Sequence, residues 1–234
     1  MKDSVRIQAQ KIGTELTDLQ ASQFEKYYEL LIEWNQKINL TRITEKEEIA
    51  LKHFADSLTL LKYCDIPKNA SVIDVGTGAG FPGIPLKIVR PDIKLTLLDS
   101  LNKRLTFLNE VCREIGIEAQ LIHSRAEDGG RDPKLREGFD LAVSRAVARL
   151  NVLSEYCLPF VKVGGLFTPM KGPDMEDEIS EAEKAVKTLG GRLIKSESFN
   201  LENAGGRTIV IIKKEKPTPK AYPRQGTKIK SKPL

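Results

Sequence analysis

The sequence has few cysteines, no long apolar run and no apolar segment among its first residues. Its three cysteines, Cys64, Cys112 and Cys157, are too few and too scattered for a disulfide framework or a zinc site. No run of about 18 apolar residues occurs, so no segment is predicted to span a membrane. The first residues, M-K-D-S-V-R-I-Q-A-Q, lack the apolar region of a secretory signal. We therefore expect a cytoplasmic protein without a metal site.

Positive charge is concentrated near the end of the sequence. The net charge is +5 at pH 7, but residues 213–234 contain seven Lys, one Arg and a single Glu and so carry +7. The first 212 residues must then sum to −2. The segment 215–234 is rich in Pro and poor in apolar residues, which predicts a flexible tail. Such a tail binds phosphates, with Tyr222 available for stacking; the alternative is a solvated segment that only improves solubility.

Apolar patterning separates a helical region from an α/β region. Residues 4–62 are helical in pattern, with one helix ending near Asn39 and another from about Glu45 to Cys64. From Ser71 onward, short apolar strands alternate with amphipathic helices, which is typical of a parallel sheet. Strands are predicted at 71–75, 93–98, 118–122, 139–143, 164–169, 192–199 and 207–213, and a helix at 174–189. The Gly-rich turn at 203–206 predicts a hairpin between the last two strands.

These patterns predict one α/β domain with two additions. With 40% hydrophobic residues, a chain of 234 residues can bury a proper core. We expect a helical extension over residues 1–66, the α/β domain over 67–214 and the basic tail over 215–234.

The stretch Val72–Gly83, V-I-D-V-G-T-G-A-G-F-P-G, joins an apolar strand to a glycine-rich loop. Gly76, Gly78 and Gly80 lack a Cβ where the chain must turn, so a ribose or an amino-acid group can approach the backbone. Pro82 suits the first turn of a following helix. The spacing G-x-G-x-G differs from the dinucleotide pattern G-x-G-x-x-G, which makes a dinucleotide oxidoreductase the least favoured interpretation. It resembles motif I of S-adenosylmethionine-dependent methyltransferases.

Polar residues that follow the predicted strands are candidates for ligand binding, because ligands of open α/β sheets lie at the carboxyl ends of the strands. Asp99 can accept hydrogen bonds from the hydroxyls of a ribose, or it can cap the next helix. Ala126 and Glu127 follow the third strand, where they can seat an adenine. Arg145 follows the fourth, and its planar fork suits a guanine edge or a phosphate; the alternative is a structural ion pair.

Six stretches spread over most of the chain form one combined pattern. They are W-N-Q-K-I-N-L-T at 34–41, K-H-F-A-D-S-L at 52–58, D-V-G-T-G-A-G-F-P-G-I-P-L at 74–86, L-L-D-S-L-N-K-R at 97–104, S-R-A-E at 124–127 and S-R-A-V-A at 144–148. Together they resemble the small-subunit ribosomal RNA methyltransferase G family, also called glucose-inhibited division protein B. The resemblance implies a class I methyltransferase fold, a seven-stranded, mainly parallel sheet with an antiparallel hairpin.

The resemblance also implies a function and a set of site residues. The methyl donor of the family is S-adenosylmethionine, and the acceptor is N7 of a guanine near the decoding site of 16S rRNA. Its cofactor contacts carry over to Gly76, Phe81, Ala126, Glu127 and Arg145. Our predicted cofactor site adds Gly78, Gly80 and Asp99, with Arg145 bridging cofactor and guanine. Predicted phosphate contacts are Lys103, Arg104, Arg125 and Lys171.

The chemistry implied needs no general base, because guanine N7 has a lone pair and no proton and requires mainly alignment. Cytosine C5 methylation would need a nucleophilic cysteine, whereas Cys112 and Cys157 lie in apolar helix patterns. Adenine amino methylation usually goes with Asn/Asp-Pro-Pro-aromatic, and this chain has Ser-Arg-Ala-Val at 144–147.

Several interpretations stay open at this point. We expect a monomer that acts on 16S rRNA or the small subunit. The alternatives are a class I methyltransferase that acts on another RNA, a protein or a small molecule, and a non-catalytic cofactor-binding RNA chaperone. His53 and Asp56 share a helix face and either bond each other or help to close the cofactor pocket. Asn39 either stops its helix or approaches the site.

Overall fold

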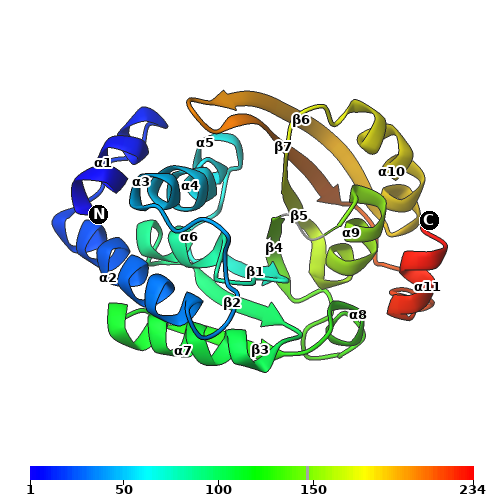
Figure 1. Cartoon of the computed structure of the whole chain (residues 1–234). Helices are drawn as coiled ribbons and strands as arrows, with labels where there is room; N and C mark the ends of the chain where they lie inside the picture. Colours follow the sequence, from blue (N-terminus) through cyan, green and yellow to red (C-terminus); the bar gives the residue numbers. More distant parts are fainter. Residues whose placement is uncertain (146–147) are drawn as a thin grey trace.

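A seven-stranded sheet runs through the middle of this computed structural model, which describes residues 1–145 and 148–234 (Figure 1). The strands are β1 (Ser71–Val75), β2 (Lys94–Asp99), β3 (Ala119–His123), β4 (Phe139–Arg145), β5 (Val161–Lys171), β6 (Gly191–Leu201) and β7 (Gly205–Lys214). Their order is β3-β2-β1-β4-β5-β7-β6. β1 to β5 pair in parallel, and β7 is antiparallel to both β5 and β6. The predicted fold class is confirmed, including the hairpin that closes the sheet.

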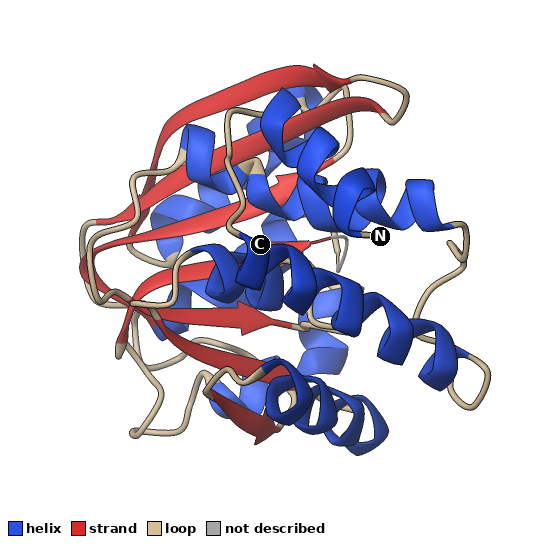
Figure 2. Cartoon of the chain, turned by 90° about the vertical axis from the view of Figure 1, so that its left-hand side faces the viewer, coloured by secondary structure: helices blue, strands red, loops and turns tan. Residues whose placement is uncertain are grey.

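Helices cover both faces of this sheet (Figure 2). The helical segments are α1 (Lys2–Lys11), α2 (Asp18–Asn35), α3 (Lys46–Ile49), the π-helix η1 (Ala50–Ala55), α4 (Asp56–Leu58), α5 (Leu60–Tyr63), α6 (Gly83–Val89), α7 (Asn102–Ile115), α8 (Ala126–Gly129), α9 (Leu150–Cys157), the 3₁₀ helix η2 (Leu158–Phe160), α10 (Glu176–Thr188) and α11 (Gly226–Ser231). One core contains Phe24, Phe54 and Phe107 from the α2, η1 and α7 side. A second core, on the other face, contains Leu153 and Phe160.

The helical extension is built differently from the two long helices that the sequence predicts. α2 starts with a capping box, in which Thr17 and Gln20 bond each other's backbone N–H. It ends at Asn35 rather than near Asn39, because the Asn35 Oδ1 accepts the backbone N–H groups of Leu40 and Thr41 at 2.8 and 3.0 Å. Asn39 is exposed.

The second predicted helix is interrupted by the π-helical segment Ala50–Ala55. A π-turn inserts an extra residue into the helical repeat and is often found at functional sites. This segment contains His53 and leads directly into Asp56, which begins α4.

Residues 215–234, predicted to be flexible, instead pack against the domain, and we call them the C-terminal strap. The guanidinium of Arg136 donates to the carbonyl oxygens of Thr218 at 2.7 Å and Tyr222 at 2.9 Å. Arg131 donates to the carbonyl of Pro223 at 2.7 Å. Tyr222 is half-buried, so its ring is less accessible for stacking than the sequence suggests. The composition of this segment indicated disorder because its partners, the guanidinium groups of Arg131 and Arg136, lie elsewhere in the chain.

Candidate active site

A cleft of about 370 Å³ lies at the carboxyl ends of β1 to β4, the position expected for ligands of such sheets. Five of the eight predicted cofactor residues line it: Gly76, Asp99, Ala126, Glu127 and Arg145. Tyr156 of α9 and Lys230 of α11 line it as well, and sequence reasoning missed both. We call this cavity the nucleoside cleft. Gly78, Gly80 and Phe81 are not part of its described lining.

The glycine loop is held against β2 by backbone and carboxylate contacts. Gly76 and Thr77 both donate to the carbonyl of Leu98, at 2.9 and 3.1 Å. Gly76, Gly78 and Gly80 have φ angles of 71°, 61° and 100°, a region that favours glycine. A Cβ on Gly80 would lie 2.6 Å from the Tyr27 hydroxyl. Gly80 is therefore required for packing against α2, whereas Gly76 is the glycine that borders the cleft.

Asp99 joins the loop to the start of α7. Its Oδ2 accepts from the Gly78 backbone N–H at 2.9 Å and from Arg104 at 3.3 Å, and its Oδ1 accepts from the Leu101 N–H at 2.9 Å. α7 begins at Asn102 with Leu101 at its cap position, so Asp99 is not the N-cap of that helix. Carboxylate oxygens have further lone pairs, which leaves Asp99 able to accept from a ribose while it fixes the loop.

Asp74 is a buried carboxylate to which the sequence analysis assigned no role. Its Oδ2 accepts from Thr77 Oγ1 at 2.8 Å and from the Gly83 N–H at 2.9 Å. Its Oδ1 has no hydrogen-bond partner within the described structure. Burial raises the pKa of Asp74 to about 6, as expected for a carboxylate removed from water. Asp74 thus holds both ends of the loop from inside the core.

Arg145 borders two clefts at once. It lines the nucleoside cleft and also a neighbouring cavity between η1, β5 and β7, which we call the acceptor cleft. Its Nη1 donates to Asp56 Oδ2 at 2.9 Å and to the Lys52 carbonyl at 3.1 Å, and its guanidinium carbon lies 4.9 Å from the centre of the Phe81 ring. The structural ion pair considered for Arg145 therefore exists, and it fixes the guanidinium between the clefts.

Asp56 is bonded by two arginines from different parts of the chain. Its Oδ2 accepts from Arg145 of β4, and its Oδ1 accepts from Nε of Arg207 of β7 at 2.9 Å. His53 does not bond Asp56; its Nδ1 lies 3.3 Å from Arg145 Nη2 and its ring stacks on Phe81. Arg207 was missed because only the antiparallel return of β7 brings it here.

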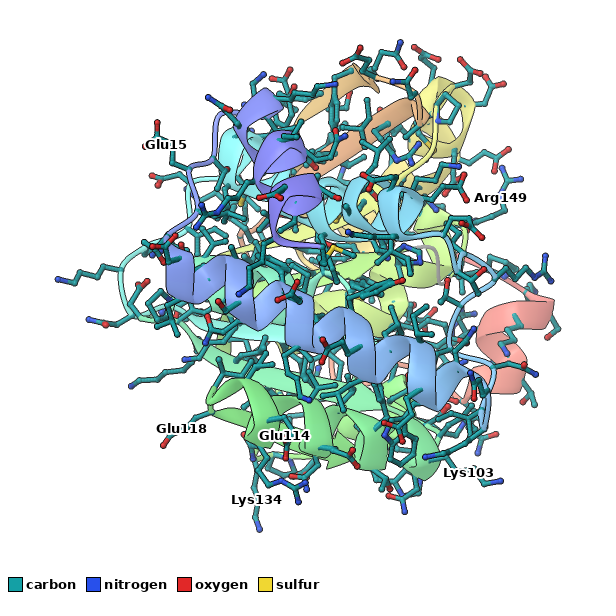
Figure 3. All side chains as sticks on the ribbon, turned by 60° about the vertical axis from the view of Figure 1, so that its left-hand side comes forward. Glu15, Lys103, Glu114, Glu118, Lys134 and Arg149 are labelled. Atoms are coloured by element: carbon teal, nitrogen blue, oxygen red, sulfur yellow. The ribbon has the colours of Figure 1, made fainter. Side chains whose placement is uncertain are left out.

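The four predicted phosphate contacts differ in their surroundings. Lys103 points outward at the start of α7 (Figure 3). Arg104 pairs with Asp99, and Arg125 pairs with Glu127 at 2.9 Å while staying largely exposed. Lys171 is instead nearly buried in the acceptor cleft, where Nζ bonds Glu178 and the Ala148 carbonyl, both at 2.6 Å. Lys171 is thus better placed to shape the cleft than to meet an RNA backbone.

The remaining predictions concern the segment after β4, membrane-spanning helices, metal ligands and the cysteines. Ala146 and Val147 of the predicted Ser-Arg-Ala-Val segment lie outside the described residues. Within residues 1–145 and 148–234, no helix is long and apolar enough to cross a membrane. The same residues contain no group of His, Cys, Asp or Glu side chains suited to a metal ion. Cys112 and Cys157 are buried, as their apolar surroundings predict.

Asp74 and His53 should affect stability in opposite directions over the same pH range. The raised pKa of Asp74, about 6 against an ordinary 3.8, makes the free energy of unfolding fall as pH rises through that window. Burial and the neighbouring Arg145 lower the pKa of His53 from 6.5 to about 4, which makes the free energy of unfolding rise between those values. The two effects oppose each other in the wild-type protein.

We therefore expect Asp74→Asn to become more stable relative to wild type as pH rises from 4 to 6. The side-chain carbonyl of the introduced asparagine can still accept from Thr77 and Gly83, so the loop contacts persist. Urea unfolding of both proteins across this range measures the difference. Parallel pH profiles for the two proteins would contradict the assignment.

Comparison with known proteins agrees with this architecture. A model of the family described as rRNA small subunit methyltransferase G matches residues 20–207. Ribosomal RNA small subunit methyltransferase G of Desulforamulus reducens is 54% identical over 228 residues, covering 97% of this chain and 95% of that protein. The protein of the same name from Brevibacillus brevis is 53% identical over 224 residues, covering 95% and 94%.

Solved structures support the fold alone, because their sequence identities are low. TrmN from Thermus thermophilus aligns with a TM-score of 0.53 at 15% identity, covering 68% of this chain and 48% of that one. TYW2 of M. jannaschii in complex with AdoMet has a TM-score of 0.53 at 16% identity, covering 73% and 77%. Since the family model spans most of the chain and relatives share about half of its residues, the protein belongs to the rRNA small subunit methyltransferase G family.

Proposed function

We propose that this protein transfers a methyl group from S-adenosylmethionine to N7 of a guanine near the decoding site of 16S rRNA. Family membership supports the enzyme class, the cofactor and the RNA substrate. The observation that carries the proposal is the position of Arg145 between the nucleoside cleft and the acceptor cleft. A residue fixed there by Asp56 can orient both reactants.

The nucleoside cleft has the chemistry that S-adenosylmethionine requires. Asp99 and Glu127 offer carboxylate oxygens to ribose hydroxyls and to the adenine edge, and Gly76 leaves the backbone open beside them. The cofactor's sulfonium supplies an electrophilic methyl group. The arginines of the cleft are each paired with a carboxylate. The cleft therefore carries little net charge, which suits a cofactor that has both positive and negative groups.

The acceptor cleft suits a planar base beside a fixed cation. Met170, Pro173 and Met175 give it apolar walls, and Lys171 and Arg207 supply donors at its edge. Guanine O6 is an acceptor that a guanidinium can hold, and this contact leaves the lone pair of N7 free to attack the methyl group. His53 is neutral at pH 7 because its pKa is about 4, and N7 has no proton to remove. Catalysis therefore consists of alignment.

We propose further that the protein works in the cytoplasm, as a monomer and without a metal ion. These proposals follow from the sequence expectations and from a substrate that is part of the small ribosomal subunit.

The test is transfer of labelled methyl from S-adenosylmethionine to unmodified 16S rRNA and to whole small subunits. Borohydride reduction and aniline cleavage then map N7-methylguanine. We expect label together with one cut in the decoding-region loop, in whichever form is the substrate, and no label on RNA that already carries the modification. Label without a cut would exclude N7 as the acceptor. Absence of label on both forms would exclude catalysis on this RNA.

A further inference from the structure

The C-terminal strap reaches the nucleoside cleft, although sequence reasoning assigned it no part in the cofactor site. Lys230 of α11 lines the cleft together with Arg125, Glu127 and Tyr156. Gly226, the first residue of α11, lies directly against the side chain of Glu127. A Cβ added to Gly226 would be 2.1 Å from Glu127 Oε1. In Figure 1, α11 lies beside α8 and α9, the two helices that border this end of the cleft.

The strap is anchored well enough to act as part of the site. Arg224 donates from Nε and Nη2 to both carboxylate oxygens of Glu155, at 2.9 and 2.6 Å, and its backbone N–H donates to the same group at 2.8 Å. Glu155 and Ile229 are both fully buried. Bidentate pairs of this kind fix orientation as well as distance. The strap therefore has one defined position against α9.

We propose that the C-terminal strap is a wall of the cofactor-binding site, in which Gly226 positions Glu127 and Lys230 contacts the nucleoside. This inference rests on the proposed function, because it assumes that the cleft binds S-adenosylmethionine. It adds a segment far along the chain to the strand-end loops that form the rest of the site.

Gly226 positions Glu127 because, without a side chain, it leaves space for the Glu127 carboxylate. Glu127 Oε1 accepts from Arg125 at 2.9 Å on one side and meets the backbone of Gly226 on the other. A residue with any side chain at 226 would displace this carboxylate, since Glu127 is the flexible partner. Gly226 begins a helix and does not have a positive φ, so the need for glycine is steric rather than conformational.

Lys230 differs from the arginines that line the same cleft. Arg104, Arg125 and Arg145 each pair with a carboxylate. Among the described residues, none of the ion pairs involves Lys230. Its ammonium group is therefore free to donate to a ribose hydroxyl or an adenine nitrogen, and its methylene stem can cover the edge of the base. Lys228 is exposed on the same helix but does not line the cleft.

The first test compares Lys230→Ala with Lys228→Ala in calorimetric binding of S-adenosylmethionine to the full-length protein. Both changes remove one exposed lysine from α11, so their effect on net charge is the same. Loss of one hydrogen bond is expected to weaken binding about fivefold in Lys230→Ala, and Lys228→Ala should bind as wild type does. Equal weakening in both variants would overturn the proposal, because it would indicate a general charge effect.

The second test uses Gly226→Ala alone and in a Glu127→Ala background. Displacement of a charged acceptor is expected to weaken cofactor binding about tenfold in the single variant. If Gly226 acts through Glu127, the same change should cost little once the carboxylate is absent. An equal loss in both backgrounds would refute positioning by Gly226. Thermal unfolding of each variant checks that the strap remains docked.

Cofactor binding by the wild-type protein distinguishes failure of the proposed function from failure of the proposal for the strap. If it fails to bind S-adenosylmethionine, the proposed function is wrong. If it binds, and Lys230→Ala and Gly226→Ala bind equally well, the proposed function stands and the strap is not part of the site.

Discussion

Arg145→Lys is expected to slow methyl transfer about 100-fold, the loss typical when reacting groups are misplaced by around an ångström. The Arg145 guanidinium contacts Asp56, the Lys52 carbonyl and the face of Phe81 at the same time. A lysine ammonium keeps the charge but lacks the planar fork, so it can satisfy only part of this set. The reduced rate should appear in single-turnover assays at saturating cofactor and RNA.

The control for this prediction is Arg149→Lys. Arg149 is exposed, pairs with Glu181 and belongs to the described lining of neither cleft. The Arg149→Lys variant should transfer the methyl group at the wild-type rate. Asp56 keeps its bond from Arg207 when Arg145 is replaced, so the fold should survive. If Arg145→Lys retained most of its activity, the guanidinium would not be the group that aligns cofactor and base.

Arg224→Met is expected to lower the free energy of unfolding by about 3–5 kcal/mol, because it leaves a buried carboxylate without its partner. Glu155 is fully buried, and Arg224 supplies its only charged contact among the described residues. The methionine fills similar space, so the loss reports the charge rather than a cavity. Urea unfolding monitored by circular dichroism measures it.

Two further variants show whether this loss has the assigned cause. Arg192→Met breaks the exposed pair with Glu215, whose side chains are 58% and 40% exposed, and should change stability very little. Exposed pairs of that kind contribute about 0–1 kcal/mol. The double variant Glu155→Leu with Arg224→Met removes the unpaired charge and should recover much of the loss. A double variant as unstable as Arg224→Met alone would contradict the role of Glu155.

The positions of the strands were predictable because each strand is a short apolar run with a turn before and after it. The observed bounds of β1, β2 and β3 differ from the predicted ones by at most one residue at either end. The gathering of predicted site residues in one cleft was also predictable, because parallel strands bring their carboxyl ends together. Asp99, Glu127 and Arg145 all lie at that edge.

What the sequence could not reveal depends on contacts between distant segments. The role of Gly80 is set by Tyr27 of α2, which no local pattern indicates. The strap has a disordered composition, yet Arg131, Arg136 and Glu155 supply partners that composition does not contain. The sequence also did not show that Lys171 points inward, where its ammonium group pairs with Glu178 rather than facing an RNA phosphate.

The two outer strands of the sheet also bear on how this protein behaves when it is crowded. A free strand edge is a template on which another molecule can add a strand and begin to aggregate. β3 offers only five residues. β6 is longer, but it carries Arg192, Lys195 and Glu197, and its pairing register shifts between Leu193 and Lys195. A short strand at one border and a charged, irregular strand at the other discourage such growth, so the molecule can leave its sheet open on both sides and remain dispersed.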